Sequence, residues 1–235
     1  MSALLLAQPR TRIKICGLTR EQDVDAAVEA GADAVGFVMY ARSPRAISPA
    51  RAAELARRLP PFVTPVLLFV NASADELRSA CDAVPHATLQ FHGDESPADC
   101  DAATADGRRP YMRAARVPLQ ATEPFDLVKF AAEYPNAQAI LLDAHVEGYG
   151  GGGKAFDWSR LPANVNARLV LSGGLTPANV TDGISQVRPR CRSLAVDVSS
   201  GVEVADGETT LKGFKDPEKI HRFVAAVRAA DKLLA

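Results

Sequence analysis

The sequence has few of the features that mark several large classes of protein. It has only four cysteines, and no two of them stand at C-x-x-C spacing, which excludes a zinc knuckle and a redox dithiol. A reducing cytoplasm is therefore the simplest setting for these thiols. No apolar run approaches the roughly 18 residues that a membrane-spanning helix needs. The four cysteines are Cys16, Cys81, Cys100 and Cys191.

Net charge is also nearly absent, at -1, with no long basic run. Neither nucleic acid nor a membrane surface is expected as a partner. Residues 1–10 begin with a short apolar stretch, but no basic residue precedes it and Pro9 and Arg10 follow, unlike a signal peptide. We predict a flexible extension over residues 1–10 and, because no linker divides the rest, a single domain over residues 11–235.

Short β-branched or aliphatic runs alternate with longer alanine-rich amphipathic runs along most of the chain, a rhythm typical of βα repetition. Several of the helical runs open with proline in the first turn. The segment after the sixth strand has room for only a turn or two of helix, at 157–160. The predicted strands are 13–16, 34–39, 63–70, 87–90, 111–113, 139–142, 169–171 and 194–198. The predicted helices are 21–30, 49–58, 74–83, 97–105, 124–133, 179–187 and 217–230.

Eight parallel βα units favour a single closed (β/α)₈ TIM barrel, whose chemistry lies at the carboxyl ends of the strands. Polar or reactive side chains follow every predicted strand. Cys16 ends the first strand, where a thiol is more open to ionisation than inside an apolar run. Asp143 directly follows the sixth. The other strand ends carry Tyr40 to Arg45, Asn71, His92 to Asp94, Arg113, Ser172 to Gly174, and Asp197 to Gly201.

Several motifs occur together in one order along residues 13–227, and with them the chain resembles the phosphoribosylanthranilate isomerase family of tryptophan biosynthesis. The motifs are KICG at 14–17, GADAVGFV at 31–38, SPR at 43–45, FVN at 69–71, LQFHGDE at 89–95, LLD at 141–143, YGGGGK at 149–154, FDW at 156–158, LSGGL at 171–175 and VDVSSGVE at 196–203.

The resemblance implies a cytoplasmic isomerase that is a monomer or homodimer and needs no cofactor or metal. The implied reaction is the Amadori rearrangement of N-(5'-phosphoribosyl)anthranilate to 1-(2-carboxyphenylamino)-1-deoxy-D-ribulose 5-phosphate. Cys16 matches the family's general base and Asp143 its general acid. Arg45 matches the arginine that binds the anthranilate carboxylate, His92 the histidine lining the pocket, and Asp197 the aspartate near the ribose hydroxyls.

The proposed chemistry requires opposite protonation states of the Cys16 thiol and the Asp143 carboxyl. The reaction needs one acid to open the sugar ring and one base to take a proton from the adjacent carbon. An electropositive site would keep the Cys16 thiolate available near neutral pH. Asp143 must instead hold a proton, so we expect burial or a nearby negative charge around it. We interpret the other three cysteines as structural, Cys81 and Cys100 in helices and Cys191 in a turn.

Two glycine-containing regions have different interpretations. The run from Gly148 to Lys154 satisfies nucleotide-binding patterns, but Ala155 replaces the hydroxyl that would hold magnesium and no long helix follows, so we reject a P-loop. The resemblance makes it a flexible loop, Gly150, Gly151, Gly152 and Gly153. A phosphate site fits better after strands seven and eight, where backbone amides and serine hydroxyls gather. Its residues would be Gly173, Gly174, Ser199, Ser200 and Gly201.

Two alternatives stay open. The related histidine-pathway isomerase performs the same rearrangement on a larger bis-phosphorylated substrate, but generally has an aspartate where Cys16 stands and carries two phosphate sites. A phosphosugar-binding barrel without catalysis is the second, since fold alone does not imply activity. Residues 204–212, longer than in many relatives, are predicted to be a surface elaboration.

Overall fold

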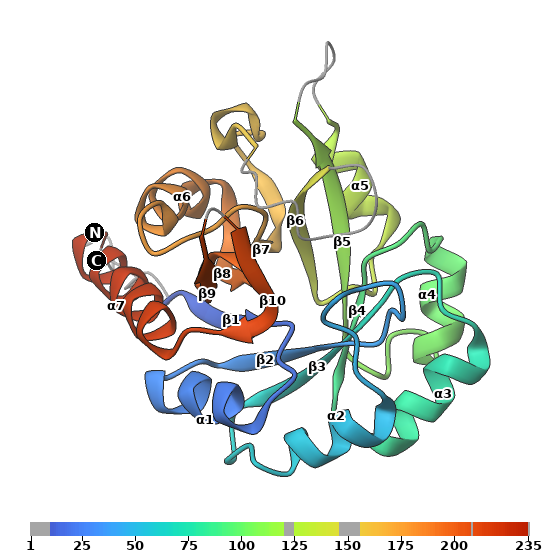
Figure 1. The fold of residues 1–235 in the computed structure, drawn as a ribbon. Helices are drawn as coiled ribbons and strands as arrows, with labels where there is room; N and C mark the ends of the chain where they lie inside the picture. The colour runs from blue at the N-terminus through green and yellow to red at the C-terminus, as the bar shows by residue number, and fades with distance from the viewer. Residues whose placement is uncertain (1–9, 120–124, 146–155, 208, 235) are drawn as a thin grey trace.

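The computed structural model describes residues 10–119, 125–145, 156–207 and 209–234. Eight parallel strands form a closed barrel in sequence order, with β8 pairing back onto β1. Figure 1 shows these strands in a ring with the helices outside it. The predicted (β/α)₈ barrel is confirmed. The strands are β1 Arg12–Cys16, β2 Ala34–Val38, β3 Thr64–Phe69, β4 Thr88–Phe91, β5 Tyr111–Pro118, β6 Ala139–His145, β7 Val165–Leu171 and β8 Cys191–Val198.

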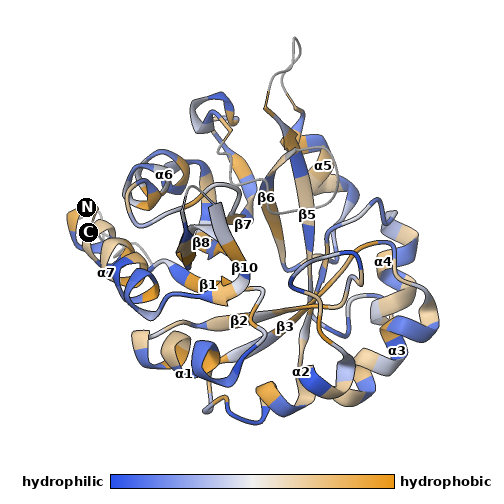
Figure 2. Cartoon of the chain, in the orientation of Figure 1, coloured by the Kyte–Doolittle hydropathy of each residue, from blue (hydrophilic) through white to orange (hydrophobic). Residues whose placement is uncertain are grey.

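Seven α-helices and three 3₁₀ helices are assigned within the described residues. Two helices begin at capping boxes: Ser73 with Glu76 starts α3, and Ser96 with Asp99 starts α4. Hydrophilic and hydrophobic residues interleave along the helices (Figure 2), as in amphipathic cover helices. The helices are α1 Glu21–Ala30, α2 Pro49–Ala56, α3 Ala74–Ala83, α4 Pro97–Thr104, α5 Leu127–Glu133, η1 Trp158–Arg160, α6 Val180–Val187, η2 Arg188–Arg190, η3 Ser200–Val202 and α7 Pro217–Leu233.

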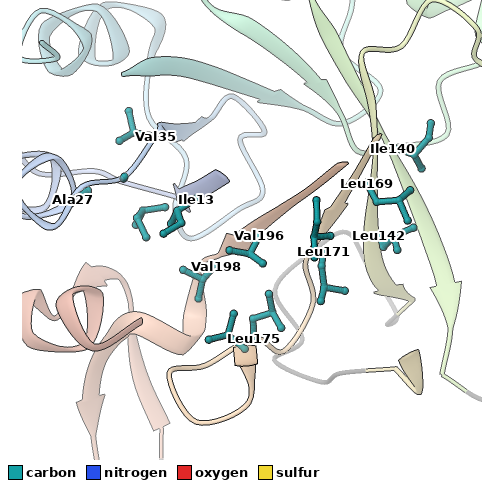
Figure 3. Packing of buried hydrophobic residues seen from close by; sticks show 14 of the residues in the cluster. Ile13, Ala27, Val35, Ile140, Leu142, Leu169, Leu171, Leu175, Val196 and Val198 are labelled. Atoms are coloured by element: carbon teal, nitrogen blue, oxygen red, sulfur yellow. The ribbon is translucent and has the colours of Figure 1, made fainter. Parts of the chain in front are cut away.

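Each strand alternates between two surroundings. One face packs against the helices in the main core, where Val196 of β8 lies between Ile13 of β1 and Leu171 of β7 (Figure 3). The other face points into the barrel, whose floor is a separate apolar cluster built on Ala114, Leu141 and Val170. Because side chains alternate along a strand, the residues two positions further toward the carboxyl ends point into the barrel above that floor.

Several boundaries differ from the expectation. β5 was expected over 111–113 and β6 over 139–142, but they extend to Pro118 and His145. The added segments, 114–118 and 143–145, contain polar residues that the barrel interior accommodates. In each strand the apolar residues on which the prediction relied therefore end before the strand does. Cys191 begins β8 instead of lying in a turn. The short helix predicted at 157–160 is confirmed as η1.

Two further expectations concern segments outside the barrel. Residues 1–9 lie outside the described part of the chain, so the flexible extension stays a prediction; Arg10 pairs with Asp33. Most of the 204–212 segment lies in an antiparallel pair, β9 Glu203–Asp206 and β10 Thr209–Lys215 (Figure 1). The pair contacts the residues that follow β1 and β8, since Thr19 donates to the Gly213 carbonyl and Lys215 to the Ser199 carbonyl. Asp206, Gly207 and Thr209 at its tip are exposed, but Glu203 and Lys215 at its base are fully buried.

Candidate active site

Cys16 lies at the carboxyl end of β1, 4% exposed, on the same face of the strand as Lys14. The Lys14 ammonium donates to Asp197 Oδ1 over 2.8 Å, and Ser172 Oγ donates to Asp197 Oδ2 over 3.3 Å. Lys14 and Asp197 are partners in the β1–β8 register, so the barrel itself places them together.

The electrostatics of Cys16 differ from the expectation of an available thiolate. Burial raises the pKa of the thiol above its ordinary value, although the Lys14 ammonium opposes that shift. Burial alone would lower the pKa of Lys14, but the Asp197 carboxylate and Cys16 raise it above the ordinary range. Lys14 therefore stays protonated at neutral pH, next to a mostly neutral thiol.

Asp143 lies on the inward face of β6, 7% exposed, in a chain of buried polar groups. Its Oδ2 is 2.9 Å from His92 Nε2, and Gln90 Nε2 is 2.9 Å from His92 Nδ1. Asp143 Oδ1 accepts from the Ala144 amide at 3.0 Å. The Gln90 amide nitrogen can only donate, so it donates to His92 Nδ1, and the His92 Nε2–H then donates to Asp143 Oδ2. The two bonds fix the orientation of the Asp143 carboxyl group.

Arg45 follows β2 and is held by a carboxylate of this same chain. Its Nε and Nη2 atoms donate to Glu203 Oε1 and Oε2 at 2.6 and 2.8 Å, a bidentate fork. Lys215 Nζ donates to Glu203 Oε1 at 3.1 Å and to the Ser199 carbonyl at 3.0 Å. Only one edge of the guanidinium is used by Glu203, which leaves Nη1 on the other edge for a ligand carboxylate.

The charges at this cluster follow from burial and pairing. Burial on its own would raise the pKa of Glu203, but the Arg45 fork and the Lys215 charge outweigh it and lower the pKa to about 2. Burial lowers the pKa of Lys215, with Glu203 opposing. Glu203 is therefore the anion that holds two buried cations together.

Removing the Glu203 charge tests how much this cluster stabilises the fold. Because its folded pKa lies below that of the unfolded chain, its contribution is present above about pH 4.5 and is lost as the pH falls toward about 2. We expect Glu203→Gln to lower the free energy of unfolding by about 3 kcal/mol at pH 7, since it leaves two buried cations without their anion. Urea unfolding measures this.

The matched control is Glu54→Gln, which removes a carboxylate that pairs with Arg51 and is 54% exposed. Its cost should stay within about 0.5 kcal/mol, because surface pairs contribute little. Equal costs for the two variants would contradict the role of the buried cluster.

The predicted phosphate segments meet at the carboxyl ends of β7 and β8. Gly173 and Gly174 have φ angles of 77° and 65°, which favour glycine, and a Cβ on Gly201 would lie 1.9 Å from the Leu175 carbonyl oxygen. The two turns therefore pack directly on each other. Within the described residues, the amides of Gly174, Ser200 and Gly201 donate no hydrogen bond. Such amides, close together, suit an anion.

Other candidates lie away from this cluster. Arg113 points outward, where its guanidinium stacks on Phe130 and Tyr134 and donates to the carbonyls of Phe91 and Gly93. It holds the end of β4 and does not face the barrel interior. Asn71 accepts from the Asp94 amide at the rim. The predicted glycine loop, 150–153, lies outside the described residues.

Four residues of the site were missed at the sequence level. Lys14 and Gln90 each stand two positions before a predicted site residue, so strand alternation would have placed them on the same faces as Cys16 and His92. Glu203 and Lys215 gave no such signal, because their roles depend on pairing with Arg45 across the fold.

No helix in the described segments is long and apolar enough to cross a membrane. Among the same residues, no three histidine, cysteine or carboxylate side chains gather as a metal site would require.

A family model described as N-(5'-phosphoribosyl)anthranilate (PRA) isomerase matches residues 13–226. The chain belongs to the N-(5'-phosphoribosyl)anthranilate isomerase family. A relative with that name from Methylibium petroleiphilum is 64% identical over 226 residues, which are 96% of this chain and 98% of the relative.

Solved structures of isomerases of this family agree with the fold. The phosphoribosylanthranilate isomerase from Thermotoga maritima is 38% identical, with a TM-score of 0.75 over 93% of this chain and 99% of that one. A second isomerase structure, in complex with reduced 1-(o-carboxyphenylamino)-1-deoxyribulose 5-phosphate, is 36% identical with a TM-score of 0.72 over the same shares. The resemblance inferred from the motifs is therefore confirmed.

Proposed function

We propose that Cys16 and Asp143 are the base and the acid with which this chain isomerises N-(5'-phosphoribosyl)anthranilate to 1-(2-carboxyphenylamino)-1-deoxy-D-ribulose 5-phosphate. The observation that carries the assignment is that both groups are buried at the carboxyl end of one barrel, on the inward faces of β1 and β6. Family membership supplies the reaction, and this geometry supports Cys16 and Asp143 as its two proton-transfer groups.

The steps balance with these two groups alone. Asp143 gives its proton to the furanose ring oxygen, the C1–O bond breaks, and the aniline nitrogen supplies the electrons that form an iminium. The Cys16 thiolate then takes the proton from C2, which leaves an enol-amine that tautomerises to the ketone. One acid and one base suffice. The contact of Asp143 with His92 holds the carboxyl in place for the first step.

The substrate's three polar parts have matching groups around the barrel mouth. The phosphate would rest on Gly173, Gly174, Ser199, Ser200 and Gly201, whose turns pack together. The anthranilate carboxylate would meet the outer edge of Arg45, while Glu203 holds the inner edge. Asp197, already bound by Lys14, lies where a ribose hydroxyl would reach it. The small phosphorylated substrate is the partner proposed.

Arg45→Lys tests the carboxylate contact. A lysine keeps the charge but loses the fork, so we expect KM to rise about 10-fold to 100-fold, as for loss of a charged hydrogen bond. Steady-state kinetics measure this. Affinity for ribose 5-phosphate, which lacks the carboxylate, is the control and should stay unchanged. Equal losses for substrate and ribose 5-phosphate would contradict the assignment of Arg45.

The histidine-pathway isomerase is distinguished by a parallel assay of the two substrates with the purified protein. We expect turnover of N-(5'-phosphoribosyl)anthranilate, and activity on the larger bis-phosphorylated substrate alone would overturn the proposal. Complementation of a tryptophan auxotroph, beside calorimetry with the reduced product analogue, separates an enzyme from a barrel that only binds. Binding without complementation would also overturn it.

A further inference from the structure

A slot at Gly36 brings the Cys16 thiol and the Lys14 ammonium together. Gly36 is the β2 partner of Cys16 in the sheet register. A Cβ on residue 36 would lie 2.7 Å from Cys16 Sγ, 3.0 Å from Lys14 Cε and 3.1 Å from Lys14 Nζ. The sulfur and the ammonium therefore both border the space that a side chain at residue 36 would fill.

The charges that face Cys16 come from three elements. Lys14 of β1 and Lys215 of β10 are cations, and Asp197 of β8 is an anion. Lys215 is held by Glu203 and by Ser199, which itself lies beside the Arg45 side chain near Gly17. Gly36, from β2, brings no charge. Lys14 is thus the cation whose ammonium lies at the same slot as the sulfur, and its side chain is only 5% exposed.

We propose that Lys14 is a positioning residue for the base: its ammonium holds the Cys16 thiolate, and Asp197 holds that ammonium in place. The inference rests on the proposed role of Cys16. Lys14 keeps its proton throughout. The thiol loses its proton to solvent before substrate binds, and the proton that Cys16 later takes comes from C2 of the substrate. A thiolate formed here is charge-compensated by the Lys14 ammonium, although Cys16 is only 4% exposed.

The test is the titration of Cys16 in the ligand-free protein, which does not depend on catalysis. Protein labelled with [3-¹³C]cysteine reports thiol ionisation through the Cβ chemical shift, and Cys16→Ala assigns the signal. We expect Lys14→Met to move the midpoint up by about one pH unit or more, the effect of losing a close opposite charge. Asp197→Asn should move it down, because the change removes a repelling anion while the asparagine oxygen still accepts from the Lys14 ammonium.

Opposite shifts of the Cys16 titration midpoint in Lys14→Met and Asp197→Asn would not result from a merely structural role of Lys14. Unchanged midpoints, or shifts in the same direction, would overturn the proposal. If Lys14→Met does not fold, Lys14→Gln, which also removes the ammonium charge, replaces it, and an unchanged midpoint in that variant would overturn the proposal. A failure of the base assignment is separate: it would appear as turnover by Cys16→Ala, whatever the Lys14 titration shows.

Discussion

Cys16→Ala should abolish turnover while the protein still binds the reduced product analogue. No other thiol lies on the inward face at the end of β1, and loss of a positioned base typically costs about 10²-fold to 10⁴-fold in rate. The alanine removes little volume from a site whose proposed phosphate and carboxylate contacts, Gly173 to Gly174, Ser199 to Gly201 and Arg45, do not include Cys16. We therefore expect kcat to fall by about 10³-fold or more, measured by steady-state kinetics, with the analogue's Kd nearly unchanged by calorimetry.

The matched control is Cys81→Ala, which removes another buried thiol, on α3 and far from the barrel mouth. It should keep near-normal kcat. Because burial raises the pKa of Cys16, wild-type activity should also fall as the pH drops below the titration of the thiol. Near-normal turnover in Cys16→Ala would contradict the assignment.

Asp143→Asn should have a comparable effect for a different reason. The amide has the shape of the carboxyl and keeps a contact to His92, but it has no acidic proton for the ring oxygen. We expect kcat to fall by about 10³-fold, with binding of the product analogue preserved. In single-turnover kinetics, the slow step of Asp143→Asn should come before proton abstraction from C2, since the ring must open first.

Asp75→Asn is the control for that change, because Asp75 lies on α3 with its side chain 87% exposed. It should leave turnover unchanged. A substrate analogue with its ring already open would bypass the acid, so Asp143→Asn should process it at near wild-type rate. Failure of that rescue, together with weakened analogue binding, would indicate a binding role for Asp143 and contradict its role as the acid.

The barrel was predictable because its signals are local. Alternating apolar runs and proline-opened helices specify each βα unit, and eight such units leave closure as the favoured arrangement. The predicted ends of β5 and β6 were wrong because a closed barrel accommodates polar side chains in its interior. The ends of β5 and β6 include Arg116 and Asp143. In the sequence alone these polar residues indicate loops, but in the closed sheet they line the interior.

The site was predictable in part. Cys16, His92, Asp143 and Asp197 converge because parallel strands bring their carboxyl ends to one face. The Arg45–Glu203 fork was not predictable, because it joins residues 158 positions apart and depends on how β9 and β10 fold back onto the mouth of the barrel. The raised pKa of Cys16 also required the structure, since burial is a property of the closed fold.

The central claim is that Cys16 and Asp143 act on one bound substrate, Asp143 on the ring oxygen and Cys16 on C2. A crystal structure with the reduced product analogue measures this most directly. We predict Cys16 Sγ within about 3.5 Å of C2 and an Asp143 carboxyl oxygen within about 3.2 Å of the oxygen derived from the ring, distances suited to proton transfer. An analogue bound with C2 turned away from Cys16, or with Asp143 against its phosphate, would contradict the account.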